Sequence, residues 1–377
     1  MQVENSKMIY RGSGELARVY RGETIVWEPV EKDYTAEYLT FRNVGNTAGV
    51  FVFRAPYGKE QYFDIEISKN NGSWIHYSAA TVSDRTVNSG GKIRVKGTHN
   101  TYTDLQSGSA DRYSNMFISG GTAYHIFGNI MSLIYGDSFS GQTRLRSQNS
   151  YCFHSLFQGG KCTNAKNLVL PATVLSDYCY EGMFAYCTSL VKVPALPATA
   201  LTRECYESMF AHCTSLVSAP SVLPATTLAD ECYGYMFAGC TSLASAPALP
   251  ATGLATECYS YMFEDCTSLV NAPVLPATTL VSGCYSRMFQ QCTSLVNAPE
   301  LPAERVRYQC YSYMFNLCSS LSYIKCLATD ISDPECTDNW VRRISANGTF
   351  VKNPSMADWG TGDSGIPSGW TVENASA

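Results

Sequence analysis

A 26-residue unit recurs through the middle of the chain and constrains its fold more than any other feature. The tetrapeptide Leu-Pro-Ala-Thr, with Glu as the last residue of the sixth copy, begins at Leu170, Leu196, Leu223, Leu249, Leu275 and Leu301. The intervals are 26, 27, 26, 26 and 26 residues. A Cys-Tyr pair and a Met-Phe-x-x-Cys motif keep the same spacing. Such repeats predict an array in which each unit completes its core against its neighbours.

The period lies within the range of leucine-rich repeats and outside those of tetratricopeptide, ankyrin and WD40 repeats. In one copy, Leu190, Val193 and Leu196 form a short extended piece. We expect it to be one strand of a parallel sheet that ends at the following proline. The next apolar residues fall at near-helical spacing, which predicts a short helix or 3₁₀ segment packed back on the strand. They are Leu201, Cys205, Met209, Phe210 and Cys213.

The expected fold is therefore a β/α solenoid, with a parallel sheet and short helices, behind an antiparallel β-sandwich-like N-terminal region. The sandwich is predicted by short apolar or alternating runs, such as residues 50–53 and 63–67, separated by glycine and asparagine turns. Before it, Ile-Tyr-Arg-Gly at residue 9 recurs as Val-Tyr-Arg-Gly at residue 19. The expected domains are a β-hairpin module (1–30), the sandwich (31–140), the solenoid (141–327) and a C-terminal cap (328–377). A cap is expected because a terminal repeat must cover an open sheet edge.

All 16 cysteines lie between Cys152 and Cys336. The two cysteines of a repeat are eight residues apart, whereas zinc sites prefer closer pairs and thioredoxin-like chemistry needs Cys-x-x-Cys. The main expectation is two ladders of small buried thiols, with disulfides within a repeat or a metal site as alternatives. The core ladders are Cys179, Cys187, Cys205, Cys213, Cys232, Cys240, Cys258, Cys266, Cys284, Cys292, Cys310 and Cys318.

The formal net charge is −5, and no part of the sequence has a basic patch that would neutralise phosphates. Nucleic acid and anionic membranes are therefore poor candidate partners. No apolar run is long enough to span a bilayer, and no cofactor motif or metal-binding histidine spacing occurs. The N-terminus lacks an apolar leader, so we expect folding in a reducing cytoplasm, unless an upstream signal was removed.

One acidic position recurs just before the cysteine of a repeat, as Glu204, Glu231 and Glu257. A glycosidase needs two neighbouring carboxylates, and stacked equivalent residues could provide them. The same position holds Tyr178, Gly283 or Gln309 in other repeats. A solvated row is therefore the main expectation, and the chain is expected not to be an enzyme.

Positions that vary around the Met-Phe motif are the better candidates for recognition. Stacked repeats would align them in a stripe, and tyrosine offers a large contact area for little loss of entropy. Neutral variation on a solvated face is the alternative, and the exposed strand face is the main rival surface. The candidate residues are Tyr186, His212, Tyr235, Tyr261, Glu264, Asp265, Arg287 and Tyr313.

The pattern over residues 144–327 resembles the BspA-like leucine-rich repeats of bacterial surface proteins. In that family a proline-ended strand precedes a segment with an aromatic-x-x-Cys step. This chain has Met-Phe where that family usually has Ala-Phe, and an extra cysteine before the tyrosine. The N-terminal Tyr-Arg-Gly duplication resembles a module of phage tail and tail-fibre proteins, especially those of gut Bacteroidales. The order of segments resembles Bacteroides proteins of prophage or tail-fibre type.

These resemblances imply a tail-fibre or receptor-binding protein that recognises a bacterial surface glycan or protein through the solenoid. The N-terminal region would contact other virion proteins, and self-association, as in trimeric fibres, is expected by analogy. Such a protein would be assembled in the host cytoplasm and located in the virion tail. The alternatives are a BspA-like adhesin on the bacterial cell surface and a glycan-cleaving tail spike.

Overall fold

The computed structural model describes residues 6–10, 16–21, 24–27, 32–56, 60–102, 113–356 and 359–376. The chain divides into a unit of residues 1–34 and a unit of residues 35–377. The first unit contains an antiparallel sheet of β1 (Ser6–Tyr10), β2 (Leu16–Arg21) and β3 (Thr24–Trp27), in that order. The expected strands are therefore present there. The domain boundary expected after residue 30 and the first Arg-Gly turn lie outside the described residues.

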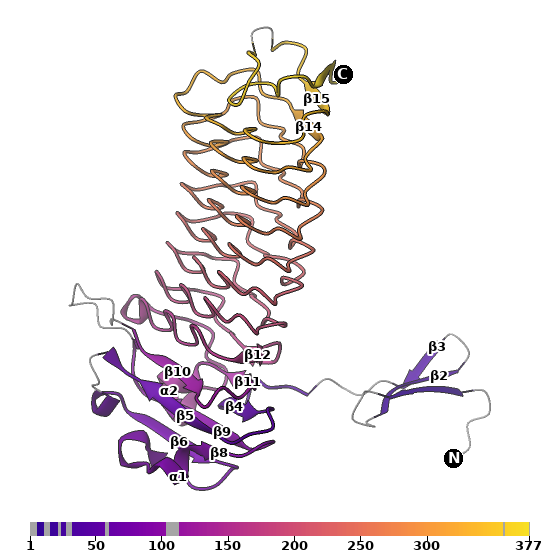
Figure 1. Ribbon diagram of the computed structural model, residues 1–377. Coiled ribbons are helices and arrows are strands. Elements are labelled where there is room, and N and C mark those ends of the chain that lie inside the picture. Colours follow the sequence, from indigo (N-terminus) through magenta and orange to yellow (C-terminus); the bar gives the residue numbers. More distant parts are fainter. Residues whose placement is uncertain are drawn as a thin grey trace. The chain divides into compact units, whose positions relative to one another are not determined.

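The second unit begins with two sheets (Figure 1). One has the order β12-β11-β4-β9-β6-β7, with β13 also paired to β11, and the other has the order β10-β5-β8. The sheets contact each other through Phe41 of β4 and Phe51 of β5, whose ring centroids are 5.0 Å apart. The strands are β4 (Leu39–Asn43), β5 (Gly49–Arg54), β6 (Ile65–Lys69), β7 (Ile75–His76), β8 (Thr86–Val87), β9 (Lys92–Gly97), β10 (Asn115–Ile118), β11 (Tyr124–Asn129), β12 (Cys162–Asn164) and β13 (Leu168–Val169).

Pairings among β4 to β11 are antiparallel, as expected for the N-terminal region. Strand β11, however, also pairs in parallel with β12 and β13, which belong to the first repeat. The larger sheet is therefore mixed, and it continues directly into the repeats. The short helices are α1 (Val82–Arg85), α2 (Ser132–Tyr135), η2 (Glu60–Tyr62), η3 (Tyr77–Ala79), η4 (Gly136–Ser138) and η5 (Ser147–Asn149).

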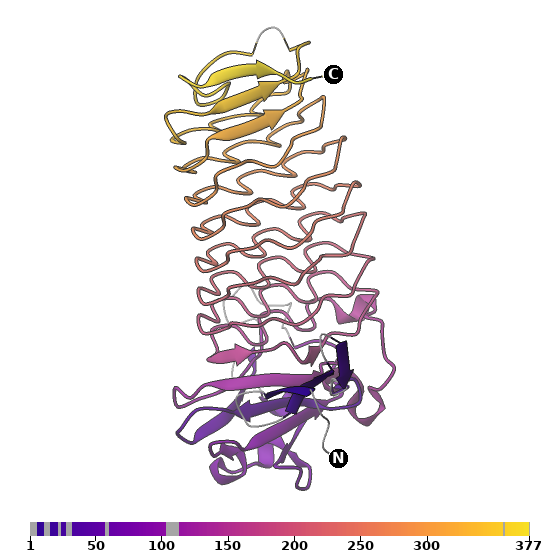
Figure 2. The same cartoon turned by 90° about the vertical axis from the view of Figure 1, so that its right-hand side faces the viewer.

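The repeats lie one above another as coils, which Figure 2 shows from the side (one coil is one repeat). On one side of the coils, single residues form parallel bridges from coil to coil, as in Ser245↔Asn271 and Asn271↔Asn297. A proline two residues later in five successive coils, from Pro194 to Pro299, keeps these strand segments short because it removes a backbone donor. Lys325 replaces that proline in the last copy, and there a regular strand forms, β14 (Tyr323–Cys326).

The expected helices are absent: no described residue beyond Asn149 lies in a helix. In each repeat, the segment that contains the Cys-Tyr pair and the Met-Phe-x-x-Cys motif instead forms consecutive turns, as over residues 178–187. This segment is here called the turn ribbon. Its backbone N–H groups donate hydrogen bonds alternately within the coil and to the next coil. Met183 N–H donates to Tyr180 C=O in the same coil, and Phe184 N–H donates to Met209 C=O of the next coil at 2.9 Å. The sequence suggested a helix because buried residues recur every four positions, close to the helical period of 3.6.

Every fourth residue of the turn ribbon has a positive φ, which produces three rows along the stack. Row one contains Tyr151, Tyr178, Glu204, Glu231, Glu257, Gly283, Gln309 and Glu335. Row two contains Ser155, Gly182, Ser208, Tyr235, Tyr261, Arg287, Tyr313 and Asn339. Row three contains Gly159, Tyr186, His212, Gly239, Asp265, Gln291, Leu317 and Arg343. Left-handed backbone costs a non-glycine residue about 1–2 kcal/mol, which the hydrogen bonds between coils offset.

Between the rows, pairs of side chains point inward and stack on their equivalents. Phe237, for example, lies between Phe210 and Phe263, with ring centroids 5.7 and 5.8 Å away. A parallel column of tyrosines runs from Tyr180 to Tyr311. Leu196, Phe210 and Cys213 are all buried, as expected from the repeat pattern.

The sixteen cysteines are buried and free of disulfides. In the Met-Phe-x-x-Cys ladder, each thiol donates to a carbonyl of the preceding coil, as Cys240 Sγ does to Phe210 C=O at 3.2 Å. Burial raises the pKa of Cys187, Cys240 and Cys318 to about 12 from 9.0. These thiols are therefore protonated and unreactive at neutral pH.

We expect the free energy of unfolding to fall as the pH rises from about 9 towards 12. In that range the unfolded chain releases thiol protons that the folded chain retains. Urea unfolding followed by circular dichroism at pH 8, 9.5 and 11 measures the effect. The variant Cys240→Ala should show a shallower pH dependence, and a constant free energy between pH 9.5 and 11 would contradict the expectation.

The C-terminal end of the stack is closed by large side chains. A parallel sheet joins β14 to β15 (Thr349–Lys352) and β16 (Thr371–Asn374). Trp340 is completely buried, and its ring stacks on Tyr311 at 6.0 Å and on Trp359 at 5.9 Å. Its indole N–H donates to Gly365 C=O at 2.8 Å.

Candidate functional site

The turn ribbon carries a groove of about 420 Å³ on its outer surface. It extends over the coils from Ser155 to Asp265. Its lining residues are Tyr113, His154, Ser155, Gln158, Glu181, Gly182, Ala185, Tyr186, Ser208, Ala211, His212, Tyr235, Ala238, Gly239, Glu264 and Asp265. No lysine or arginine is among them.

The groove exists because row two contains small residues in three successive coils. These are Ser155, Gly182 and Ser208, and the next residue of the row is Tyr235. The Tyr235 ring stacks on Tyr261 at 4.2 Å, on the C-terminal side. Its opposite face is therefore turned towards Ser208 and closes one end of the groove.

Row three forms one side of the groove. Tyr186 stacks on His212 at 4.7 Å, and Tyr186 is 53% exposed. Gly239 follows His212, and a Cβ at this glycine would lie 2.3 Å from His212 Nδ1. Its φ of +71° also disfavours a side chain. Glycine at this position therefore keeps the imidazole in place and the groove open.

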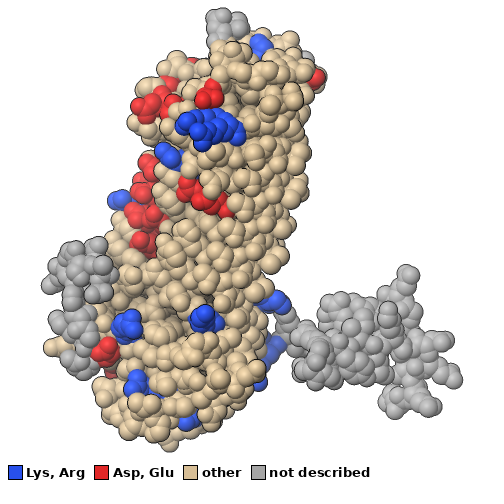
Figure 3. Space-filling model, in the orientation of Figure 1, with Lys and Arg blue, Asp and Glu red and all other residues tan. Residues whose placement is uncertain are grey.

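Carboxylates dominate the charge of the groove. Burial raises the pKa of Glu264, and the neighbouring Asp265 raises it further. Burial likewise raises the pKa of Asp265. At the other end, Glu181 Oε2 lies 3.4 Å from His154 Nδ1. Acidic side chains gather along one edge of the repeat stack (Figure 3).

Beyond the groove, row two continues as a ladder of rings and a guanidinium. Arg287 lies between Tyr261 and Tyr313, at 5.3 and 4.3 Å from the two ring centroids. Such cation–π contacts each contribute about 0.5–1 kcal/mol at exposed sites. The ladder fills the space that the small residues leave open in the earlier coils.

The candidate stripe from the sequence is thus divided by the structure. Tyr186, His212, Tyr235, Glu264 and Asp265 line the groove. Tyr261, Arg287 and Tyr313 lie outside it, in the ladder. Sequence reasoning missed Tyr113, His154 and Glu181. It also missed Gly182 and Ser208, although small residues where other repeats have large ones were a usable signal.

Beside the groove, Glu181, Glu204 and Glu207 form the one acidic cluster of the described residues whose spacing could hold a metal ion. One carboxylate oxygen from each lies within 4.8 Å of the others. The pKa of Glu207 is raised to about 9, chiefly by burial. Its side-chain hydrogen bond with Glu204 and the negative charges of the surrounding glutamates raise it further. Of the acidic row expected from the sequence, Glu204 and Glu231 contact Arg203 at 2.9 and 3.4 Å.

We expect Glu207→Gln to increase the free energy of unfolding at pH 8 and to change it little at pH 4. Between pH 4.5 and about 9 the unfolded chain loses a proton that folded Glu207 retains, so stability is lost as the pH rises. The gain should be at least about 1 kcal/mol, since one pKa unit corresponds to about 1.4 kcal/mol. Urea unfolding at both pH values measures it. The exposed Glu373→Gln is the control, and equal effects of the two variants at pH 8 would argue against a raised pKa of Glu207 in the folded protein.

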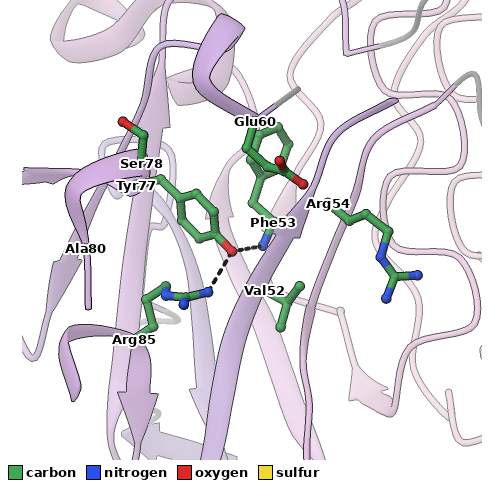
Figure 4. Close-up of a pocket in the computed structure, with 8 residues that line it drawn as sticks. All are labelled: Val52, Phe53, Arg54, Glu60, Tyr77, Ser78, Ala80 and Arg85. Atoms are coloured by element: carbon green, nitrogen blue, oxygen red, sulfur yellow. Dashed lines mark hydrogen bonds between the residues drawn. The ribbon is translucent and has the colours of Figure 1, made fainter. Parts of the chain in front are cut away.

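A second hollow, of about 510 Å³, lies in the N-terminal region beside β5. Tyr77 and Arg85 are among its lining residues (Figure 4). The Tyr77 hydroxyl accepts hydrogen bonds from the backbone N–H of Phe53 and from Arg85, both at 2.9 Å. These contacts satisfy the hydroxyl within the fold, so the hollow is a weaker candidate than the groove.

In the part of the chain that the structure describes, no helix has the length and apolar character needed to cross a membrane. Coils of 26 residues, joined by parallel bridges on one side and turns on the other, define a leucine-rich-repeat protein. Its repeats are of the BspA type: residues 148–296 and 233–333 match the model of the BspA type leucine rich repeat region, with six copies. Neither the curated proteins nor the solved structures contain a match to the chain.

Proposed function

We propose that this chain is a non-enzymatic binding protein whose repeats form a solenoid, behind a sandwich-like N-terminal region. In this proposal the turn ribbon recognises a glycan or protein on a bacterial surface. The groove carries the proposal, because it joins exposed aromatic rings, carboxylates and small residues on a scaffold held by hydrogen bonds between coils. Concave sites with few, well-placed polar groups are typical binding sites.

We further propose that the protein acts as a tail-fibre receptor-binding protein of a phage that infects Bacteroides. Residues 1–34 form a compact unit of their own, which suits attachment to other virion proteins. The Tyr-Arg-Gly duplication in that unit resembles tail-protein modules. A BspA-like adhesin on the bacterial cell surface is the alternative, and it would use the same groove.

Labelling of Bacteroides cells with the fluorescent full-length protein tests recognition. We expect a variant with Tyr186→Ser and His212→Ser to label cells at least tenfold more weakly. The matched control carries Val191→Ser and Val270→Ser, two exposed positions on the strand side of the coils. Equal loss in both variants, or no loss in either, would reject the turn ribbon as the recognition surface. Purified tail particles that carry the chain would support the phage role over the adhesin.

A glycan-cleaving tail spike is the second candidate, and Glu207 favours it. A carboxyl group with a raised pKa beside another carboxylate is the pairing that glycosidases use. This candidate predicts the release of sugars from host polysaccharide and its loss in Glu207→Gln. No release at high protein concentration would eliminate it.

A further inference from the structure

The charge and shape of the groove indicate what kind of ligand it can hold. Its lining contains the carboxylates of Glu181, Glu264 and Asp265 and no lysine or arginine. Burial raises the pKa of Glu264 and Asp265 although Gln290 donates a hydrogen bond to Glu264 and Gln291 forms one with Asp265, so their ionised forms are only partly compensated within the fold. A cationic group in the groove would supply that compensation, whereas an anionic ligand would add to the repulsion.

An aromatic face at one end of the groove suits the same kind of ligand. Tyr235 turns one ring face towards Ser208, because Tyr261 covers the other face. At the opposite end, the rings of Tyr113 and Tyr151 stack on His154 at 5.3 and 5.8 Å, so these rings cover one another. Ammonium and guanidinium groups bind to the faces of aromatic rings and form hydrogen bonds with carboxylates.

The groove is also long enough for a polymer. From the coil of Ser155 to that of Tyr235, whose ring closes one end, it spans three steps, and parallel segments are about 4.8 Å apart. Its open length is therefore about 14 Å, which an extended peptide covers with about four residues. Alternate side chains of such a peptide point to the same side and can enter the groove.

We propose that the groove binds an extended segment of a protein partner through its lysine or arginine side chains. This inference rests on the proposed binding function and specifies its ligand class. A neutral glycan would use the tyrosine rings and hydroxyls, but it would bring no positive charge to Glu264 and Asp265. The acidity of the groove therefore favours the basic peptide.

The repeats themselves supply a variant that blocks the groove. Row two has tyrosine in three later coils, at Tyr235, Tyr261 and Tyr313, so Ser208→Tyr introduces a residue that this position accommodates elsewhere. The new ring would extend the ladder onto the free face of Tyr235 and fill the groove. We expect Ser208→Tyr to melt at or above the wild-type temperature, since stacked rings stabilise the fold.

Fluorescence anisotropy with purified full-length protein tests the ligand class. The probe is a labelled nonapeptide with lysine at alternate positions between serine and glycine. The comparison probes are the same peptide with glutamate in place of lysine, and maltoheptaose as a neutral oligosaccharide measured by calorimetry. We expect only the lysine peptide to bind, and its affinity to fall as salt rises.

We expect Ser208→Tyr, and separately the pair Glu264→Gln and Asp265→Asn, to weaken binding of the lysine peptide at least tenfold. Val217→Tyr, which adds a tyrosine at an exposed strand-side position, is the matched control and should leave binding unchanged. Equal binding of the lysine and glutamate peptides would overturn the proposal, as would lysine-peptide binding that neither groove variant weakens. Oligosaccharide binding that Ser208→Tyr abolishes, without peptide binding, would also overturn it and assign the groove to a glycan.

Cell labelling distinguishes the proposed recognition function from the proposed ligand class. If Ser208→Tyr abolishes cell labelling but the lysine peptide does not bind, the proposed recognition function stands and the ligand class is wrong. If the peptide binds in the groove but the wild-type protein labels no cells, the ligand class stands and the cell-surface function is wrong.

Discussion

Replacing Phe237 with alanine is expected to lower the free energy of unfolding by about 3–5 kcal/mol. Phe237 is completely buried between the rings of Phe210 and Phe263. Removing it leaves a cavity that two coils share, and the backbone cannot close it because hydrogen bonds fix the spacing of the coils. In an array where each unit contacts only its neighbours, one such cavity weakens two interfaces.

Urea unfolding monitored by circular dichroism measures the loss at Phe237. The control is Val274→Ala in the same half of the array, where the side chain is 77% exposed. A surface change of this kind should alter the free energy by less than about 0.5 kcal/mol. A loss below about 1 kcal/mol for Phe237→Ala would mean that the phenylalanine column does not hold the coils together.

Replacing Trp340 with alanine is expected to cost about 3–5 kcal/mol and, in addition, to make the protein self-associate. The indole covers the end of the tyrosine column at Tyr311 and stacks on Trp359. Its loss would expose the last apolar rings of the array, and exposed apolar patches promote association.

Denaturation and light scattering together test the role of Trp340. Val372→Ala on β16, where the valine is 44% exposed, is the control and should remain unchanged in both measurements. Destabilisation without association would show that Trp340 stabilises the fold but does not protect the end of the stack.

The repeat spacing was sufficient to predict which side chains form the core. Leu196, Phe210 and Cys213 recur at fixed positions, and a residue that recurs in every unit meets its own equivalent in the next. Burial of such columns follows from stacking alone. The strand expected over residues 190–196 should end at the proline after Leu196, but only a single bridge forms there, at Lys192. Another proline, Pro194, lies inside that segment, and the regular strand β14 forms where Lys325 takes its place.

The sequence did not predict the turn ribbon. Buried pairs four residues apart fit a helix almost as well as a run of turns, since 4 is close to 3.6. Positive φ is usually signalled by glycine or asparagine, whereas these rows contain residues such as Tyr186, Glu231 and Arg287. Their conformation is imposed by hydrogen bonds to the next coil, which no single repeat reveals.

The groove was only partly predictable for a related reason. The variable stripe correctly included residues that line it, such as Tyr235 and Asp265. The hollow itself arises from the small size of Gly182 and Ser208, and from the contribution of Tyr113 in the N-terminal region. Pairing of β11 with β12 joins that region to the first repeat, over a sequence separation too long for local patterns to indicate.

The alternating hydrogen bonds of the turn ribbon give the array an electrical polarity. In one coil the N–H groups of Tyr180, Gly182 and Phe184 all point towards the C-terminal neighbour. Each peptide unit has a dipole of about 3.5 D, and dipoles aligned over many coils add together. The negative pole lies at the N-terminal coils, whose carbonyl groups face residues 35–140, and the positive pole lies near Trp340. Permanent backbone charge separation therefore attracts cations to the same end of the molecule that has the groove.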